Sequence, residues 1–171
     1  MINKIGIIGA GTMGCGIAQV ASQNNHPVIL VDNNKDQLEN AAFSLDKILS
    51  RLIVKGKISA EDKKGIQDRI NFTSDPKELA QCDLVIEAIV ENIKVKHEVF
   101  QNIEKIVSDS CILASNTSSL SIASIGSALK KSERIIGLHF FNPAPLMPLV
   151  EIIPAVQTSE DTLNKAKSII D

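Results

Sequence analysis

The residues GIIGAGTMGCG, numbers 6–16, decide the fold class of this 171-residue chain. They join a short β-branched run to an amphipathic stretch, and they contain the pattern G-x-G-x-x-G. In such a turn between a strand and a helix, the first glycine permits the tight bend, the second lets backbone approach a pyrophosphate, and the third lets the helix pack on the sheet. The free N–H groups and positive dipole of the helix N-terminus favour phosphate. We therefore predict a phosphate-binding turn made by Gly9, Gly11, Thr12, Met13 and Gly14.

An acid at the end of the next apolar run indicates which ligand carries the phosphates. The run PVILVD, residues 27–32, ends at Asp32, where a carboxylate can accept hydrogen bonds from the hydroxyls of an adenosine ribose. A carboxylate also repels a ribose 2′-phosphate, and Asn33 and Asn34 supply no arginine to bind one. The sequence thus favours NAD over NADP. The alternative is that the glycine turn and the acid serve packing alone.

Segments typical of strands and of helices alternate along the chain. Helical periodicity is present at residues 12–23, 35–55, 59–69, 93–107 and 121–129. Ser59 and Asp62 are spaced to cap the third of these helices. Apolar runs typical of buried strands occupy residues 4–9, 27–32, 82–89, 111–116 and 134–141. Because helices separate the strands, we predict an α/β fold of the Rossmann type: a doubly wound, mostly parallel sheet with helices on both faces.

The composition changes after residue 142. Prolines at positions 143, 145, 148 and 154 surround the run LVEIIP, residues 149–154. This run predicts a short strand at the edge of the sheet, and an antiparallel direction is possible for it. Helix-start chemistry at Thr158 or Ser159 then predicts a final helix that continues to Asp171. We interpret residues 1–171 as one domain.

Composition and charge exclude several classes of protein. With 44% hydrophobic residues, 22% charged residues and a net charge of -2, the chain has no bulk attraction to nucleic acid or to anionic lipid. The apolar runs are far shorter than the roughly 20 residues that span a bilayer. The N-terminus lacks a secretory cleavage pattern. We therefore expect a cytoplasmic protein that binds neither nucleic acid nor membrane.

The cysteines and histidines do not form a recognisable metal or redox motif. Three widely spaced cysteines indicate reduced thiols with structural roles, and they are Cys15, Cys82 and Cys111. The histidines show no local spacing of metal ligands, so we expect no metal; they are His26, His97 and His139. The G-x-S-x-G elbow of many serine hydrolases is also missing.

Polar residues lie at or just after the ends of three of the predicted strands, where a doubly wound sheet binds its ligand. They are Glu87 and Glu91 in EAIVEN, Ser118 and Ser119 in SNTSS, and His139 in HFFN. Taken singly, the acids could be solvated, a serine could cap the helix from position 121, and the histidine could be buried and satisfied. Together they favour acid and base chemistry, because a carboxylate on one nitrogen of a histidine fixes its tautomer. Glu151, on the predicted edge strand, is placed to be that carboxylate.

Four stretches together resemble the 3-hydroxyacyl-CoA dehydrogenase family in its N-terminal NAD-binding domain. They are IGAGTMGCGIAQVAS (8–22), VIEAIVENIKVKHEVF (85–100), ASNTSSLSI (114–122) and GLHFFNPAPLMPLVE (137–151). The likeness covers essentially the whole chain and is greatest to the bacterial 3-hydroxybutyryl-CoA dehydrogenases. It implies an NAD-dependent oxidation of L-3-hydroxyacyl-CoA to 3-ketoacyl-CoA, or the reverse with NADH, as in β-oxidation and butanoate metabolism.

The resemblance also implies roles for individual residues. His139 would take the hydroxyl proton while hydride leaves C3, and Glu151 would orient the imidazole. Ser118 would hydrogen-bond the reacting oxygen, and Asn142 would position nicotinamide and substrate. The cofactor contacts expected beyond the glycine turn are Asp32, Glu91, Lys96, Asn116, Ser118 and Asn142.

For coenzyme A, the resemblance points to basic residues around the end of the long second helix. They are Arg51, Lys55 and Lys57. The alternative explanation is an exposed, charged helix face. Where the family places a serine contact to coenzyme A, this chain has Ile48.

Members of this family continue into an α-helical C-terminal domain that closes over the acyl chain and forms a homodimer. The predicted final helix would lead into that domain, which residues 1–171 do not include, so we expect weak activity from this chain alone. Two alternatives remain open from the sequence. One is an NAD-binding or structural module without turnover, and the other is a dehydrogenase of a free 3-hydroxy acid.

Overall fold

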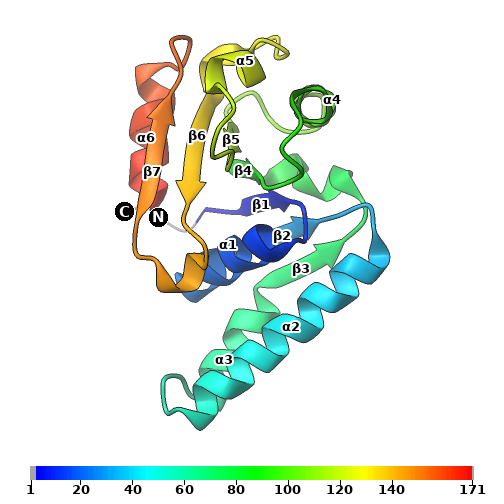
Figure 1. Ribbon diagram of the computed structural model, residues 1–171, viewed down its shortest axis with the longest axis vertical. Helices are drawn as coiled ribbons and strands as arrows, with labels where there is room; N and C mark the ends of the chain where they lie inside the picture. The colour runs from blue at the N-terminus through cyan, green and yellow to red at the C-terminus, as the bar shows by residue number, and fades with distance from the viewer. Residues whose placement is uncertain (1–2, 171) are drawn as a thin grey trace.

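The computed structural model describes residues 3–170 and contains a seven-stranded sheet in the order β3-β2-β1-β4-β5-β6-β7 (Figure 1). Strands β1 to β6 pair in parallel, and β7 pairs antiparallel with β6 at the edge. The strands are β1 (Ile5–Ile8), β2 (Val28–Val31), β3 (Ile70–Thr73), β4 (Leu84–Glu87), β5 (Ile112–Ser115), β6 (Ile135–Phe140) and β7 (Val150–Pro154). The predicted doubly wound, mostly parallel sheet is confirmed, and its edge strand is antiparallel.

Residues 3–170 also form six α-helices and three 3₁₀ helices, of which α6 follows the last strand and the others lie between strands. The α-helices are α1 (Thr12–Gln23), α2 (Lys35–Val54), α3 (Ala60–Asp68), α4 (Ile93–Glu104), α5 (Ile122–Gly126) and α6 (Glu160–Ile170). The 3₁₀ helices are η1 (Pro76–Gln81), η2 (Ser132–Arg134) and η3 (Ala144–Leu146). Helices α2 and α3 form an arm that extends from the sheet, and α6 lies beside β7 (Figure 1). The last residue, Asp171, where the final helix was predicted to continue, is outside the described residues.

The core consists of two apolar clusters, one on each face of the sheet, and each α-helix contributes to the cluster on the face that it covers. One cluster contains buried residues of α1, α2, α3 and α6, and the other contains buried residues of η1, α4 and α5. Successive side chains of a strand point to opposite faces, so Leu84 and Ile86 belong to the first cluster and Val85 to the second. By the same alternation, Glu87 and His139 face the side of the sheet that carries α4 and α5. This alternation determines where the polar residues at the strand ends meet.

Local capping explains why several predicted helix starts agree with the structure. The Ser59 hydroxyl accepts a hydrogen bond from the Asp62 N–H at 2.9 Å, and the Asp62 carboxylate accepts one from the Ser59 N–H at 2.8 Å. Asn34 caps α2 and Asn92 caps α4 in the same manner, with side-chain oxygens accepting backbone N–H groups. At the final helix, Ser159 accepts from the Thr162 N–H at 3.1 Å, which decides between the two predicted starts.

Other predicted elements are too long. The helix predicted over 121–129 ends at Gly126, because the chain then turns through a hydrogen bond from the Leu129 N–H to the Gly126 carbonyl. The helix predicted over 93–107 ends at Glu104, where Ile106 begins a turn by bonding back to Ile103. These ends depend on tertiary packing more than on periodicity.

The three cysteines are free and at least partly buried, in keeping with structural roles. Burial raises the pKa of Cys15 to about 11 and the pKa of both Cys82 and Cys111 to about 12. The described residues contain no group of three or more metal-ligating side chains that could hold an ion. Within residues 3–170, no helix is long and apolar enough to cross a membrane.

Candidate functional site

The glycine turn between β1 and α1 has the geometry of a phosphate cradle. Gly9 has φ of +105°, and a Cβ there would lie 2.5 Å from the Ala88 carbonyl oxygen. A Cβ on Gly14 would lie 1.8 Å from the Gly9 carbonyl oxygen, so neither position accepts a side chain. A Cβ on Gly11, in contrast, would meet nothing within 4 Å. No side chain caps α1, so the N–H groups of its first turn, at Thr12 and Met13, have no side-chain acceptor, and the space beside Gly11 is open.

Hydrogen bonds hold the Asp32 side chain beside this turn. One of its carboxylate oxygens accepts the Ala10 N–H at 2.8 Å, and the other accepts the Asn34 N–H at 2.9 Å. The first bond ties the end of β2 to the glycine turn, and the second tightens the chain before α2. Each oxygen keeps a second lone pair for a ribose hydroxyl.

Glu87 is buried at the end of β4, so its explanation as a solvated acid is wrong. It is 0% exposed, and one carboxylate oxygen accepts from Lys96 Nζ at 2.6 Å and from the Ile89 N–H at 2.8 Å. The other oxygen accepts from the Ser115 hydroxyl at 2.7 Å. Lys96, on α4, is itself 1% exposed. Two residues of opposite charge are therefore buried together beneath the ends of β4 and β5.

Glu91 extends this cluster toward the surface. Its carboxylate lies 3.1 Å from Lys96 Nζ, accepts the Thr117 hydroxyl, and accepts the Ser119 hydroxyl at 3.2 Å. Partial desolvation raises the pKa of Glu91, but the Thr117 hydrogen bond and the hydrogen bond and charge of Lys96 outweigh it and bring the pKa to about 2. Glu91 is therefore a carboxylate across the physiological range. The Lys96 ammonium lies between two carboxylates, and its predicted contact with the cofactor remains a prediction.

His139 and Glu151 form a pair across β6 and β7. The antiparallel register sets the two residues opposite each other, and His139 Nδ1 lies 2.7 Å from a Glu151 carboxylate oxygen. The His139 side chain is 20% exposed and packs against the Phe141 ring at 4.8 Å between centroids. When Nδ1–H donates to Glu151, the lone pair of Nε2 is free to accept a proton. The structure places Glu151 beside His139, as expected, and the histidine is not fully buried.

The remaining residues predicted for catalysis or cofactor binding lie in the loops after β5 and β6. Asn116 Oδ1 accepts the Phe140 N–H at 2.8 Å and so joins the ends of these two strands. Ser118 is exposed and makes no hydrogen bond with any described residue, which leaves its hydroxyl free for a ligand. Asn142 is exposed beside the same strand end, before a cis peptide bond to Pro143. The interpretation of Ser118 or Ser119 as a helix cap is wrong, because Ser121 caps α5.

The basic residues predicted for coenzyme A are not beside this cluster. Arg51, Lys55 and Lys57 are exposed, in the last turn of α2 and in the connection to α3. A helix of 20 residues is about 30 Å long, so these side chains lie at the end of α2 that is remote from Asp32. Ile48 is 43% exposed on the same helix. Binding of coenzyme A by this arm remains a prediction.

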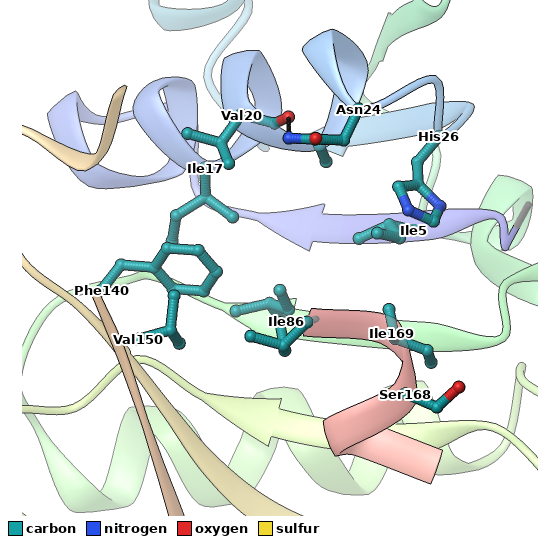
Figure 2. A pocket seen from close by; sticks show the side chains of 12 residues that line it. Ile5, Ile17, Val20, Asn24, His26, Ile86, Phe140, Val150, Ser168 and Ile169 are labelled. Carbon is teal, nitrogen blue, oxygen red and sulfur yellow. Dashed lines mark hydrogen bonds between the residues drawn. The ribbon is translucent and has the colours of Figure 1, made fainter. Parts of the chain in front are cut away.

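A cavity of about 310 Å³ lies on the other face of the sheet, between α1 and α6 (Figure 2). Ile17, Ile86 and Phe140 line it, and their side chains belong to the face opposite to Glu87 and His139. Its polar lining is limited to Asn24, His26 and Ser168 among the described residues. The cavity therefore lacks the charged groups of the strand ends, and we place the functional site at the glycine turn and the His139–Glu151 pair.

Comparison with known proteins identifies the chain. The family described as 3-hydroxyacyl-CoA dehydrogenase, NAD binding domain, matches residues 4–171. The chain belongs to this family. It is 45% identical over 159 residues to a probable 3-hydroxybutyryl-CoA dehydrogenase of Deinococcus radiodurans, with 93% of this chain and 57% of that protein covered. It is 40% identical over 178 residues to the mitochondrial hydroxyacyl-coenzyme A dehydrogenase of Sus scrofa, with 100% of this chain and 55% of that protein covered.

A solved structure of the same family has the same fold. The (S)-3-hydroxybutyryl-CoA dehydrogenase from Ralstonia eutropha superposes with a TM-score of 0.96 at 38% identity, over 99% of this chain and 60% of that one. The chain therefore spans little more than half the length of these relatives.

The glycine turn of this member of the 3-hydroxyacyl-CoA dehydrogenase family fits NAD. A cofactor phosphate needs close backbone approach and free N–H groups, and the open space at Gly11 beside the uncapped start of α1 supplies both. Asp32, held next to that turn, supplies a carboxylate for the ribose. No basic side chain follows it at Asn33 or Asn34. These observations agree with the NAD assignment of the family.

Sequence reasoning named Glu87 as a polar strand end but did not pair it with Lys96, and it missed Ser115 and Thr117, which bond to Glu87 and Glu91. Two signals for the Glu87–Lys96 pair were present. Glu87 ends an otherwise apolar run, where the alternation of side chains buries it. Lys96 falls on the apolar stripe of α4, three residues after Ile93 and four before Phe100, so its ammonium required a buried partner.

Proposed function

We propose that this chain is the catalytic NAD-binding domain of a dehydrogenase that oxidises L-3-hydroxyacyl-CoA to 3-ketoacyl-CoA with NAD, or reduces 3-ketoacyl-CoA to L-3-hydroxyacyl-CoA with NADH. The observation that carries the proposal is the His139–Glu151 pair, whose interacting atoms are 2.7 Å apart. The pair lies near the carboxyl end of β6, and the glycine turn follows the carboxyl end of β1. A base with an orienting carboxylate beside a redox cofactor is what removal of a hydroxyl proton requires. The names of the similar proteins support the same substrate class.

The residues of the chain perform the proton transfer and the positioning. Bound NAD supplies the hydride acceptor at its nicotinamide. In oxidation, His139 Nε2 takes the proton of the C3 hydroxyl, and the Glu151 carboxylate stabilises the resulting imidazolium through Nδ1–H. The free Ser118 hydroxyl donates to the reacting oxygen. In the reverse direction, the protonated His139 returns the proton to that oxygen.

The whole protein's organisation belongs to the same proposal. We take residues 1–171 as one NAD-binding domain, and we expect the longer protein to enclose the acyl chain with a second, α-helical domain and to form a homodimer. An exposed position of Arg51, Lys55 and Lys57 is compatible with coenzyme A binding along the arm. A cytoplasmic location stays a prediction, because relatives include mitochondrial proteins.

A comparison of two histidine variants tests this function. His139→Gln should retain NADH binding, measured by nicotinamide fluorescence, and should lose oxidation of NADH by acetoacetyl-CoA by about 10²- to 10⁴-fold. His97→Gln is the matched control, because His97 Nε2 bonds to the Ser124 carbonyl on α5 and not to a carboxylate. Equal turnover by His139→Gln and by the wild type would contradict the proposal. NADH binding without any turnover by the wild type would favour an NAD-binding module without chemistry.

The substrate class needs a second comparison. We expect acetoacetyl-CoA, and not free acetoacetate, to protect Lys55 and Lys57 from acylation by an amine-reactive reagent. Equal oxidation of NADH by the two compounds, with no protection of these lysines, would favour a dehydrogenase of a free 3-hydroxy acid.

A further inference from the structure

Glu87 holds together three segments that are distant in sequence. Its carboxylate accepts hydrogen bonds from Ile89 in the loop after β4, from Lys96 on α4 and from Ser115 at the end of β5. All four interacting groups converge behind the strand ends, and Glu87 and Ser115 are both 0% exposed. The residue is therefore too deep to touch a substrate, and its influence on the site must pass through its partners.

Resting on the proposed function, we propose that Glu87 is a positioning residue that fixes the loop carrying Ser118. It does so by two routes. One route passes through the Ser115 hydroxyl, and the other passes through Lys96 and Glu91. Both routes end on residues that flank Ser118 in the chain.

The first route is short. The Ser115 hydroxyl donates to Glu87 and, through its oxygen, accepts the Thr117 N–H at 3.2 Å. The Glu87 carboxylate thus sets the direction in which the Ser115 oxygen lone pairs point. This direction fixes the backbone one residue before Ser118.

The second route begins at the ammonium of Lys96. It lies 2.6 Å from Glu87 and 3.1 Å from Glu91, and therefore bridges the two carboxylates. Glu91 in turn accepts the hydroxyls of Thr117 and Ser119, the two neighbours of Ser118. The Thr117 hydroxyl oxygen also accepts the Leu120 N–H at 2.9 Å. Ser118 is the one member of this loop segment whose own hydroxyl is left free for a ligand.

Packing alone does not explain the buried charges. A carboxylate and an ammonium lose their hydration when they are buried, and apolar residues of similar volume would fill the same space without that cost. The other buried residues of α4, Phe100 and Ile103, show that this helix packs well with apolar side chains. The charged pair supplies what apolar packing cannot, which is directional hydrogen bonding to both loops.

Hydrogen exchange tests the positioning without any cofactor. In Glu87→Gln, we expect the amides of Ser119 and Leu120, which both bond to Thr117 Oγ1, to exchange about 10-fold faster than in the wild type. Ser115→Ala, which removes only the first route, should show a smaller increase in the exchange rate of these amides. This variant replaces Glu87→Gln in the test if Glu87→Gln does not fold. Ser22→Ala is the matched control, because its buried hydroxyl donates to the Ile66 carbonyl on the other face of the sheet. Unchanged exchange at Ser119 and Leu120 in both variants would overturn the proposal.

Turnover tests the consequence for chemistry. A displacement of about 1 Å in a catalytic group can lower a rate by about 100-fold, so kcat for NADH oxidation by acetoacetyl-CoA should fall 10- to 100-fold in folded Glu87→Gln. NADH affinity should change less than about threefold, and Glu87→Asp should recover part of the rate because it keeps the charge. Equal kcat in wild type and Glu87→Gln, or an equal loss in Ser22→Ala, would overturn the positioning role. If the wild type itself does not oxidise NADH, the proposed function fails, and hydrogen exchange still decides whether Glu87 fixes the loop.

Discussion

At the scale of single residues, the site consists of side chains whose freedom the surrounding structure removes. His139 faces Glu151 because the β6–β7 register makes them neighbours, and Asp32 is held by two backbone N–H groups. The sequence predicted these residues because each carries a chemical signature at a strand end. It did not predict Glu87 as the partner of Lys96, because that contact depends on how α4 packs across the sheet.

Removing the negative charge of Glu151 tests the pair. Glu151→Gln should lower kcat by about 10²-fold or more, because an amide neither stabilises the imidazolium nor selects the Nδ1–H tautomer as strongly. NADH affinity should stay within about threefold of the wild type. Glu160→Gln, an exposed acid at the start of α6, is the control. A kcat equal to that of the wild type would show that Glu151 does not orient His139.

Substitution of two glycines of the turn should have different effects. Gly14→Ala should lower the free energy of unfolding by about 1–3 kcal/mol or more, because its Cβ would overlap the Gly9 carbonyl oxygen. Gly11→Ala should leave stability almost unchanged and weaken NADH binding at least about 10-fold, because its Cβ would occupy the open space. Thermal unfolding and fluorescence titration distinguish the two. Full NADH affinity in Gly11→Ala would contradict the location of the phosphates.

The lowered pKa of Glu91 predicts how stability depends on pH. A carboxyl whose pKa falls from its ordinary 4.5 to about 2 on folding stabilises the protein above pH 4.5 and loses that contribution as the pH falls toward 2. The urea concentration at which half of the protein is unfolded should therefore be higher for the wild type than for Glu91→Gln at pH 5. This difference should narrow steadily as the pH is lowered toward 3. A gap that is constant or widens on acidification would show that the charge of Glu91 is not stabilised by its neighbours.

At the scale of secondary-structure elements, boundaries that depend on local hydrogen bonds were predicted well, and boundaries that depend on tertiary contacts were not. The start of α3 was readable because Ser59 and Asp62 satisfy each other's backbone within one turn. The end of α5 was not, because Gly126 lies against Ile135 of β6, a contact that periodicity does not reveal. The short 3₁₀ helix η1 was also missed, since six residues after the Asp75 cap are too few to leave a periodic pattern.

The cap of α3 should contribute stability without affecting the site. Ser59→Ala removes the acceptor of the Asp62 N–H and should lower the free energy of unfolding by about 1 kcal/mol. NADH binding should not change, because α3 is part of the arm and not of the glycine turn. Urea denaturation and fluorescence titration of the same samples measure both quantities. An altered NADH affinity would show that the arm and the cofactor site are coupled.

At the scale of the whole molecule, the parallel sheet brings the separate signals to one edge. The glycine turn follows β1, Asp32 follows β2, the buried acid ends β4, and His139 lies near the end of β6. Alternating segments were enough to predict this arrangement, because parallel strands place their carboxyl ends together. The position of Arg51, Lys55 and Lys57 relative to the site was not predictable, because it depends on the length and direction of α2.

Substrate enclosure is the property that this domain is expected to lack. The chain covers little more than half of its relatives, and correct positioning of reactants contributes roughly 7–11 kcal/mol to catalysis. We therefore expect NADH binding of ordinary strength and slow turnover.

The most direct measurement follows the transferred hydrogen. The chain is incubated with acetoacetyl-CoA and NADH that carries two deuterium atoms at C4 of the nicotinamide. The mass of the product is then measured by mass spectrometry. We predict 3-hydroxybutyryl-CoA with one deuterium at C3, formed by the wild type and by His97→Gln and formed at least about 100-fold more slowly by His139→Gln. Unlabelled product, or no hydroxy product at all, would contradict hydride transfer by this domain.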